Sequence, residues 1–466
     1  MTDITHGANA PADTRAASKY YLVAWRWHFY AGLYVIPFLL MLAMTGLTML
    51  WISWGAGLAA ERMAVPPGDT TMAVSTLQQA AETAVPGGRA VQYIEPLAKD
   101  RVAVFSVENA NGTTGVALDP YTGDVLHSFP WRAGWYDFAN DVHGTLLLGT
   151  LGDRMIEIAA SLAVVLIATG LYLNWPRNGS GWRNALVPQL DARGRSFWKS
   201  LHGALGTWVS LILMLFLLSG LSWAGIWGER IVQAWNTFPA EKWGAPLSDA
   251  THAEMNHEGS HEVPWTLEQT PMPSSGSLAG TDAIADTVTV DSIAEFARTL
   301  GFAGRFQISL PQDETGVWTI SHDSMSNDGP NPAADRTLHI DQYTGNVLAD
   351  VRYSDYSAYA KAMAWGIAFH EGDMGVWNLV LNTIVCLSVL VISLTGLVMW
   401  WKRRPARAGR LAAPPMPRDV PLWKGAAALV VLLGVLFPMA GISIAVVVLL
   451  DLTLLRAVPV LRRILS

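Results

Sequence analysis

Two histidines open long apolar runs, where an ionisable side chain is costly and marks a candidate functional site. His28 begins one run and His202 begins another, and each run is long enough, at about 1.5 Å per residue, to cross a bilayer of roughly 30 Å. A glycine follows each histidine by 18 residues, Gly46 in the first run and Gly220 in the second. The equal spacing indicates that this element of the chain is duplicated.

A second pair of histidines also occupies matching places, ahead of two further apolar runs. Gly170 follows His143 by 27 residues and Gly396 follows His370 by 26, and a threonine precedes each of these glycines. The two distances differ by one residue, so this match is weaker than the first. Each copy of the duplicated unit therefore carries two histidines, one expected near each side of the membrane.

Two neutral imidazoles on opposite sides of an iron ion are the axial ligands of a b-type haem, and neighbouring helices can supply one imidazole each. His28 with His202 predicts one such site, and His143 with His370 predicts a second. These four histidines are therefore the candidate cofactor-binding and metal-ligating residues, for two bis-histidine b-type haems. The alternative is that all four are interface histidines that hydrogen-bond to loops.

Small and basic residues lie beside the inner pair, His28 and His202, and beside His143. Small residues let a flat macrocycle approach the helix backbone, and Arg26 and Lys199 are placed to pair with haem propionates. The small residues are Gly32, Gly144, Gly203, Ala204 and Gly206.

The composition supports a membrane location. Of the 466 residues, 51% are apolar and only 15% are charged, which indicates a polytopic membrane protein and excludes an ordinary soluble one. The single cysteine, Cys386, excludes an internal disulfide and a thiolate-bound iron–sulfur cluster. We find no dinucleotide-binding glycine loop, phosphate-binding loop or Ser-His-Asp order. We therefore predict no catalytic side chain, and an electron donor outside the chain.

Apolar runs and charge set the expected topology. The last run contains Phe437-Pro438-Met439-Ala440-Gly441 near its middle and is expected to form a hairpin of two short helices, giving about six spans. Arginine and lysine crowd the short loops after the second and fourth spans, which places those loops and both termini in the cytoplasm. The runs lie at about 29–54, 156–175, 203–227, 376–401 and 421–455.

The two long loops on the other side share a second repeat. Residues 119–126 read Asp-Pro-Tyr-Thr-Gly-Asp-Val-Leu and residues 341–348 read Asp-Gln-Tyr-Thr-Gly-Asn-Val-Leu, with six of eight positions identical. An alternating segment precedes each copy, and helical patterns at 75–85 and 291–300 come before those. Each loop is thus expected to fold as a small α+β module.

These motifs resemble the PepSY-associated transmembrane proteins. The resemblance is carried, in order along residues 20–455, by Trp27-His28-Phe29-Tyr30-Ala31-Gly32, the two Thr-Gly turns, Val263-Pro264-Trp265-Thr266-Leu267 and Phe437-Pro438-Met439-Ala440-Gly441. It implies a bacterial inner-membrane protein of iron acquisition, with some members acting as di-haem reductases of ferric siderophores. The expected partners are a ferric siderophore or another periplasmic ferric complex, a cytoplasmic or quinol electron donor, and lipid, but no nucleic acid.

The expected fold is a mainly α polytopic membrane protein with two periplasmic PepSY-like modules and an internal duplication. Its parts are a disordered N-terminus (1–18), a span (19–55), the first module (56–142), a span (143–176), a basic loop (177–199), a span (200–228), a linker with the second module (229–369), a span (370–402), a basic loop (403–420), a helical hairpin (421–456) and a cytoplasmic tail (457–466).

The expected function is outward electron transfer through two haems that reduces a ferric complex. The alternative is a non-redox membrane protein whose exported modules bind a protein or a metal. One segment, 252–262, carries three histidines and Met255 and looks like a copper or iron site. A flexible acidic linker is the favoured interpretation of that segment, because its spacing fits no single rigid geometry.

Overall fold

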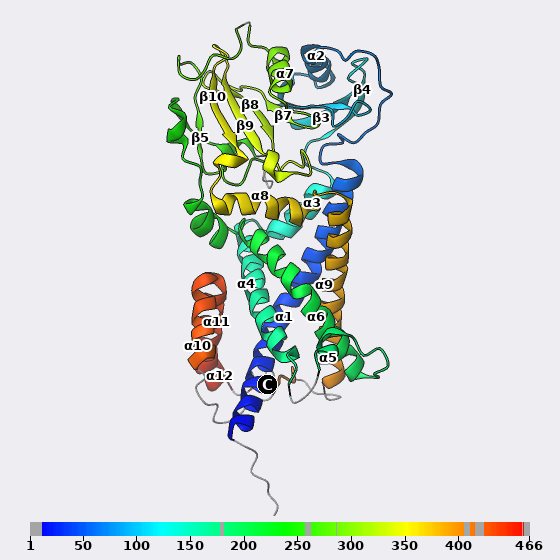
Figure 1. Ribbon diagram of the computed structural model, residues 1–466, viewed down its shortest axis with the longest axis vertical. Coiled ribbons are helices and arrows are strands. Elements are labelled where there is room, and N and C mark those ends of the chain that lie inside the picture. The colour runs from blue at the N-terminus through cyan, green and yellow to red at the C-terminus, as the bar shows by residue number, and fades with distance from the viewer. Residues whose placement is uncertain are drawn as a thin grey trace, which may run out of the picture. The chain divides into compact units, whose positions relative to one another are not determined.

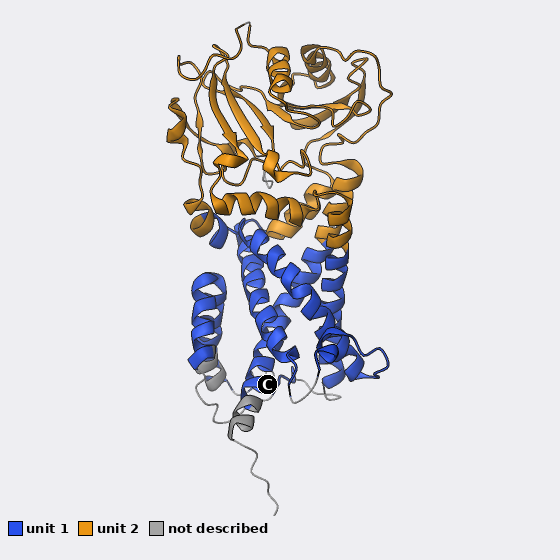
Figure 2. Ribbon diagram, in the orientation of Figure 1, with its two compact units in different colours: residues 1–44, 148–229, 384–466 blue, residues 45–147, 230–383 orange. Residues whose placement is uncertain are grey.

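The computed structural model describes residues 12–177, 181–256, 262–285, 287–404, 411–414, 424–458 and 460. The chain divides into two compact units, coloured separately in Figure 2. Unit 1 comprises residues 1–44, 148–229 and 384–466, and unit 2 comprises residues 45–147 and 230–383.

Long apolar helices build unit 1. Their packing uses small residues, since Ala160 and Ala163 lie in one buried cluster with Val35 and Leu217. Within the described chain, four helices are long and apolar enough to cross a membrane: α1 (Ala12–Ala56), α4 (Thr150–Asn174), α6 (Arg195–Leu221) and α9 (Val376–Arg403) (Figure 1). The short helix α5 (Trp182–Leu186) packs against α6.

The last apolar run forms a helical hairpin with its break where the sequence predicts it. Helix α10 (Lys424–Leu436) ends before Phe437, and α11 (Pro438–Leu452) begins at a proline, which suits a first helical turn because it has no N–H to leave unpaired. A Cβ added to Gly441 would lie 2.6 Å from the carbonyl oxygen of Gly434, so these helices meet at two glycines. Both helices are shorter than the four candidate spans, and the expected count of six spans is not shown. A final short helix is α12 (Leu454–Ala457).

An antiparallel sheet of eight strands organises unit 2, in the order β10-β9-β8-β7-β1-β2-β3-β4. The first half consists of β1 (Arg89–Ile94), β2 (Ala103–Asn109), β3 (Gly112–Leu118) and β4 (Val125–Pro130). The second half consists of β7 (Gln307–Ser309), β8 (Val317–His322), β9 (Arg336–Asp341) and β10 (Val347–Arg352).

Each predicted Thr-Gly turn joins the last two strands of its half. The carboxylates of Asp119 and Asp341 each accept a hydrogen bond of 2.8 Å from the backbone N–H two residues later. Gly123 and Gly345 adopt φ angles of 77° and 71°, a left-handed conformation that favours glycine. The residues that the two copies share therefore build matching turns in the two halves.

The two halves form one continuous sheet, where the sequence predicted two separate modules. Strand β1 pairs with β7, with Tyr93 opposite Ile308. Helices α2 (Val74–Ala84) and α7 (Val290–Thr299), close to their predicted positions, pack on the same face and share one apolar core (Figure 1). Periodicity within a strand does not reveal which edge it pairs with, so sequence reasoning missed this junction.

Two short helices in unit 2 carry the second pair of histidines. His143 lies on α3 (Trp135–Thr145) and His370 on α8 (Ala358–Glu371), so neither residue lies in α4 or α9 as the expected spans 143–176 and 370–402 had placed them. Helix α8 ends because Gly372 adopts a φ of 89°, and α3 ends at Leu146, whose φ is 55°. Between α6 and α7 the chain also forms a two-stranded ribbon, β5 (Leu247–Thr251) with β6 (Pro271–Pro273).

Candidate functional site

His28 on α1 and His202 on α6 face each other within unit 1. Their ring centres are 6.2 Å apart and the ring planes are nearly perpendicular, at 88°. Metal–nitrogen bonds of about 2.0 Å, with about 1.1 Å from each nitrogen to its ring centre, give about 6.2 Å between two imidazoles on opposite sides of one ion. The separation of these two ring centres therefore equals the one expected for two imidazoles that share one ion.

Hydrogen bonds from the ring nitrogens fix the tautomer of both histidines. The Thr169 hydroxyl donates to the carbonyl of Val165, so it accepts from Nδ1 of His28 at 3.0 Å. Nδ1 of His202 likewise donates to the carbonyl of Ile392 and to the Thr395 hydroxyl, both at 3.0 Å. A neutral imidazole has one N–H, so each Nε2 keeps a lone pair that can bind a metal.

Glycines make the room that these rings occupy. A Cβ added to Gly170 would lie 3.2 Å from Cε1 of His28, and one added to Gly396 would lie 3.6 Å from Cε1 of His202. Each glycine directly follows the threonine that bonds the same ring. The Thr-Gly pairs that marked the sequence repeat thus position the histidines, a role that sequence reasoning did not assign to them.

His143 and His370 form a second pair with nearly the same geometry, within unit 2. Their ring centres are 6.4 Å apart and the planes cross at 79°. The Thr45 hydroxyl lies 2.8 Å from Nδ1 of His143, which repeats the threonine partner found at the first pair. Burial, together with the nearby His143, lowers the pKa of His370 to about 3. This imidazole is therefore neutral at ordinary pH, as a metal ligand must be.

Two asparagines of α9 hold the end of α8 that carries His370. The side-chain amide of Asn382 donates to the carbonyls of Phe369 and His370, at 2.7 and 3.0 Å, and Asn378 donates to the same Phe369 carbonyl at 3.0 Å. These carbonyls belong to the last turn of α8, so the two asparagines cap the helix. Their role was not predicted, because a buried asparagine in an apolar run has no distinctive spacing.

The comparisons with known proteins agree with the sequence motifs. The family model of the PepSY-associated TM region matches residues 25–403, which include all four histidines. The chain belongs to this family. A comparison with curated proteins gave no match.

In this PepSY-associated transmembrane protein, two of the glycines beside His28 and His202 leave room for a flat macrocycle and a third does not. Gly32 and Gly206 lie one helical turn after His28 and His202, and a Cβ added to either glycine would have no atom of the described residues within 4 Å. Gly203 has a different role, because a Cβ there would lie 2.5 Å from the Asn174 side chain. That glycine serves the packing of α4 against α6.

The basic residues expected at the propionates have other partners or face solvent. Arg26 donates to the carbonyl of Pro414 at 2.6 Å and lies over the Tyr30 ring, and Lys199 is exposed. Neither side chain has an ion pair within the described part of the chain. Their contact with propionates stays a proposal.

The predicted flexible linker at 252–262 is ordered over its first residues. His252 is 1% exposed and bonds to the carbonyl of Thr270, so it belongs to a folded core rather than to a solvated segment. Residues 257–261 read His-Glu-Gly-Ser-His, the order found in zinc-binding helices. They lie outside the described residues.

Proposed function

We propose that this protein transfers electrons across the membrane through two bis-histidine haems and reduces a ferric complex outside the cytoplasm. The observation that carries the proposal is the separation of the ring centres, 6.2 Å in one pair and 6.4 Å in the other. Both values suit one iron between two imidazoles. Two sites at such similar geometry in a duplicated chain favour a shared function over chance contact.

The side chains have positioning roles in this proposal. Haem, when bound, supplies reversible one-electron chemistry. His28, His202, His143 and His370 would offer Nε2 lone pairs, and Thr169 and Thr395 hold the rings of His28 and His202 in one tautomer. No side chain needs to act as a general acid or base, because the transfer of an electron alone moves no proton between substrate and protein.

The proposed substrate class is a ferric siderophore, which the family implies and hard-ligand chemistry supports. Anionic oxygen ligands bind the trivalent ion more tightly than the divalent one, so reduction loosens the complex. The donor would be a cytoplasmic protein or a quinol, and the location would be the bacterial inner membrane with both termini inside.

A spectrum and a transfer assay test the proposal together. The purified protein, expressed with haem available, should give a reduced α-band and a haem-to-protein ratio near two. In vesicles that receive electrons on the cytoplasmic face, a ferrous chelator on the other face should report reduction of a ferric siderophore. His143→Ala and His370→Ala should stop that reduction, and His127→Ala, an exposed histidine on β4, should not. Absence of haem would favour a non-redox binding protein.

A further inference from the structure

A third pair of histidines lies in unit 2, away from the four described above. His252 begins a 3-10 turn that runs to Met255, and His339 lies in the middle of β9. Their Nε2 atoms are 2.9 Å apart, and both side chains are buried, at 1% and 0% exposure. Their ring centres are only 4.9 Å apart, so no haem iron with two axial imidazoles fits between them.

Both rings are anchored through their other nitrogen. Nδ1 of His252 donates to the carbonyl of Thr270 at 2.7 Å, which leaves Nε2 of His252 with a lone pair. Nδ1 of His339 lies 2.9 Å from the Thr319 hydroxyl, which can either donate or accept. Histidines that bind metals through Nε2 are held in this way by a carbonyl or a hydroxyl at Nδ1. Burial also lowers the pKa of His252 to about 4 and that of His339 well below its usual value, so both rings are neutral.

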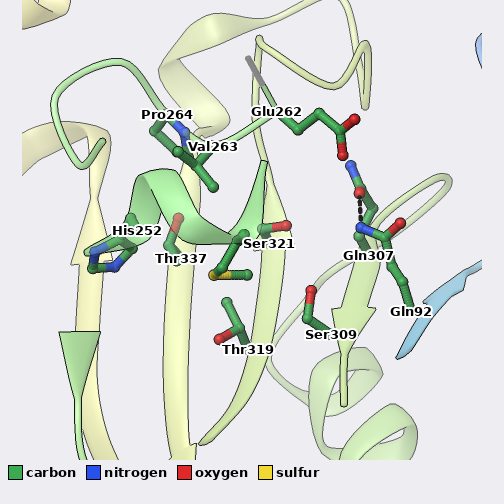
Figure 3. Close-up of a pocket in the computed structure, with 11 residues that line it drawn as sticks. Gln92, His252, Glu262, Val263, Pro264, Gln307, Ser309, Thr319, Ser321 and Thr337 are labelled. Carbon is green, nitrogen blue, oxygen red and sulfur yellow. Dashed lines mark hydrogen bonds between the residues drawn. The ribbon is translucent and has the colours of Figure 1, made fainter. Parts of the chain in front are cut away.

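A thioether and an unpartnered hydroxyl share a cavity with His252. Residues three apart on a 3-10 turn lie on the same side, which brings Met255 next to His252, and both residues line the cavity. Figure 3 shows the labelled His252, Thr319 and Thr337 around it. The hydroxyl of Thr337 is buried and has no hydrogen-bond partner among the residues that the structure describes. The cavity volume is about 20 Å³, which holds one water or one ion but no siderophore.

We propose that His252, His339 and Met255 bind one copper ion in its monovalent state. Thioether and imidazole ligands together favour Cu(I) over hard ions. Among the described residues, no three His, Cys, Asp or Glu side chains converge on one point, which disfavours a site for zinc. The carboxylate that lines the cavity, Glu262, is paired with Arg132 at 2.7 Å.

Binding requires only a small change at the two rings. At metal–nitrogen bonds of about 2.0 Å, a trigonal angle separates the two Nε2 atoms by about 3.5 Å, so the rings part by about 0.6 Å. The metal replaces the N–H···N hydrogen bond between them. The proton on Nε2 of His339 moves to its Nδ1, which then donates to Thr319, so no net proton is lost. This site does not depend on the proposed haems.

Competition titration of the full-length protein with Cu(I) and a Cu(I) chelator tests the site, whatever the haem content. The wild type should bind one equivalent. His252→Asn and His339→Asn should abolish binding, and Met255→Leu, which keeps volume and apolarity, should weaken it by at least about tenfold. The matched control is a chain with both His257→Ala and His261→Ala, which should bind as the wild type does. Copper-edge X-ray absorption should show two nitrogens and one sulfur.

Any of three results would overturn the proposal. The first is a wild type that does not compete with the chelator for Cu(I). The second is loss of the ion from the control with His257→Ala and His261→Ala, and the third is an absorption spectrum without sulfur together with normal binding by Met255→Leu. A His339 variant that does not fold leaves the test intact, because Met255→Leu and the absorption spectrum decide it.

Discussion

The hydroxyl of Thr169 accepts a hydrogen bond from Nδ1 of His28 at 3.0 Å while it donates to the carbonyl of Val165. One hydroxyl thereby connects the backbone of α4 to a ring on α1 and decides which nitrogen of that ring is free. The same arrangement recurs between Thr395 and His202. The orientation of the His28 and His202 rings therefore depends on threonines of neighbouring helices.

Removal of that hydroxyl should change a haem potential without loss of the haem. Thr169→Val deprives the His28 N–H of an acceptor, which makes the imidazole a weaker donor and disfavours the ferric state. A hydrogen bond worth about 1 kcal/mol corresponds to about 40 mV for a one-electron couple, so the potential should rise by that order. Redox titration followed at the α-band measures it, with Thr169→Ser as the control. An unchanged potential in the valine variant would remove the threonine from this role.

Loss of either inner histidine should remove the same haem. His28→Ala and His202→Ala each leave iron with one axial imidazole, so each should lose the low-spin spectrum of one component and spare the other. Low-temperature difference spectra resolve the components. Effects on different components in the two variants would show that the pairing is wrong.

A methyl group should disturb the two glycine positions unequally. Gly170→Ala places a Cβ 3.2 Å from Cε1 of His28, so the ring must shift by a few tenths of an ångström, whereas Gly396→Ala gives an ordinary contact of 3.6 Å with His202. Paramagnetic resonance of the oxidised protein, which reports the angle between axial rings, should change more in Gly170→Ala. The reverse order would count against this account of the site.

The stability of unit 2 should fall as the pH rises from about 4 to about 7 because of Asp335. Burial, offset in part by hydrogen bonds from Ser324, raises the pKa of this carboxyl from 3.8 to about 7. Between these pH values the folded chain keeps a proton that the unfolded chain has released. The free energy of unfolding therefore falls, by at most about 4 kcal/mol at pH 7. Asp335→Asn should show a smaller fall in Tm between pH 5 and pH 8 than the wild type. Asp69→Asn, at an exposed position, should follow the wild type.

Reporter fusions should place both long loops on the periplasmic side. The basic loops after α4 and α9 are expected inside, so alkaline phosphatase fused at Gly112 or at Gly329 should be active and the same fusion at Gly194 should be inactive. Phosphatase activity at Gly194 alone would invert the topology and with it the proposed direction of electron flow.

Spacing along the sequence predicted some contacts of the folded molecule and gave no sign of others. Equal distances from His28 and His202 to their glycines anticipated the pair that the structure brings together, and the repeated Thr-Gly turns anticipated the matching β-hairpins. These features depend on local order along the chain. The pairing of His252 with His339 joins residues 87 positions apart and leaves no periodic trace. The positions of His143 and His370 outside the long helices follow from helix ends at Leu146 and Gly372. Each of these ends depends on the backbone conformation of a single residue.

The junction of β1 with β7 implies a history for the duplicated chain. Each of the pairs His28 with His202 and His143 with His370 takes one ring from each copy, as the sheet takes four strands from each. A chain of single-copy length would therefore have been complete only as a two-fold symmetric dimer. Fusion into one polypeptide freed the copies to diverge. The position of β3 that matches His339 is Ala117. The buried His252 lies in a segment before the second half of the sheet that has no counterpart in the first copy.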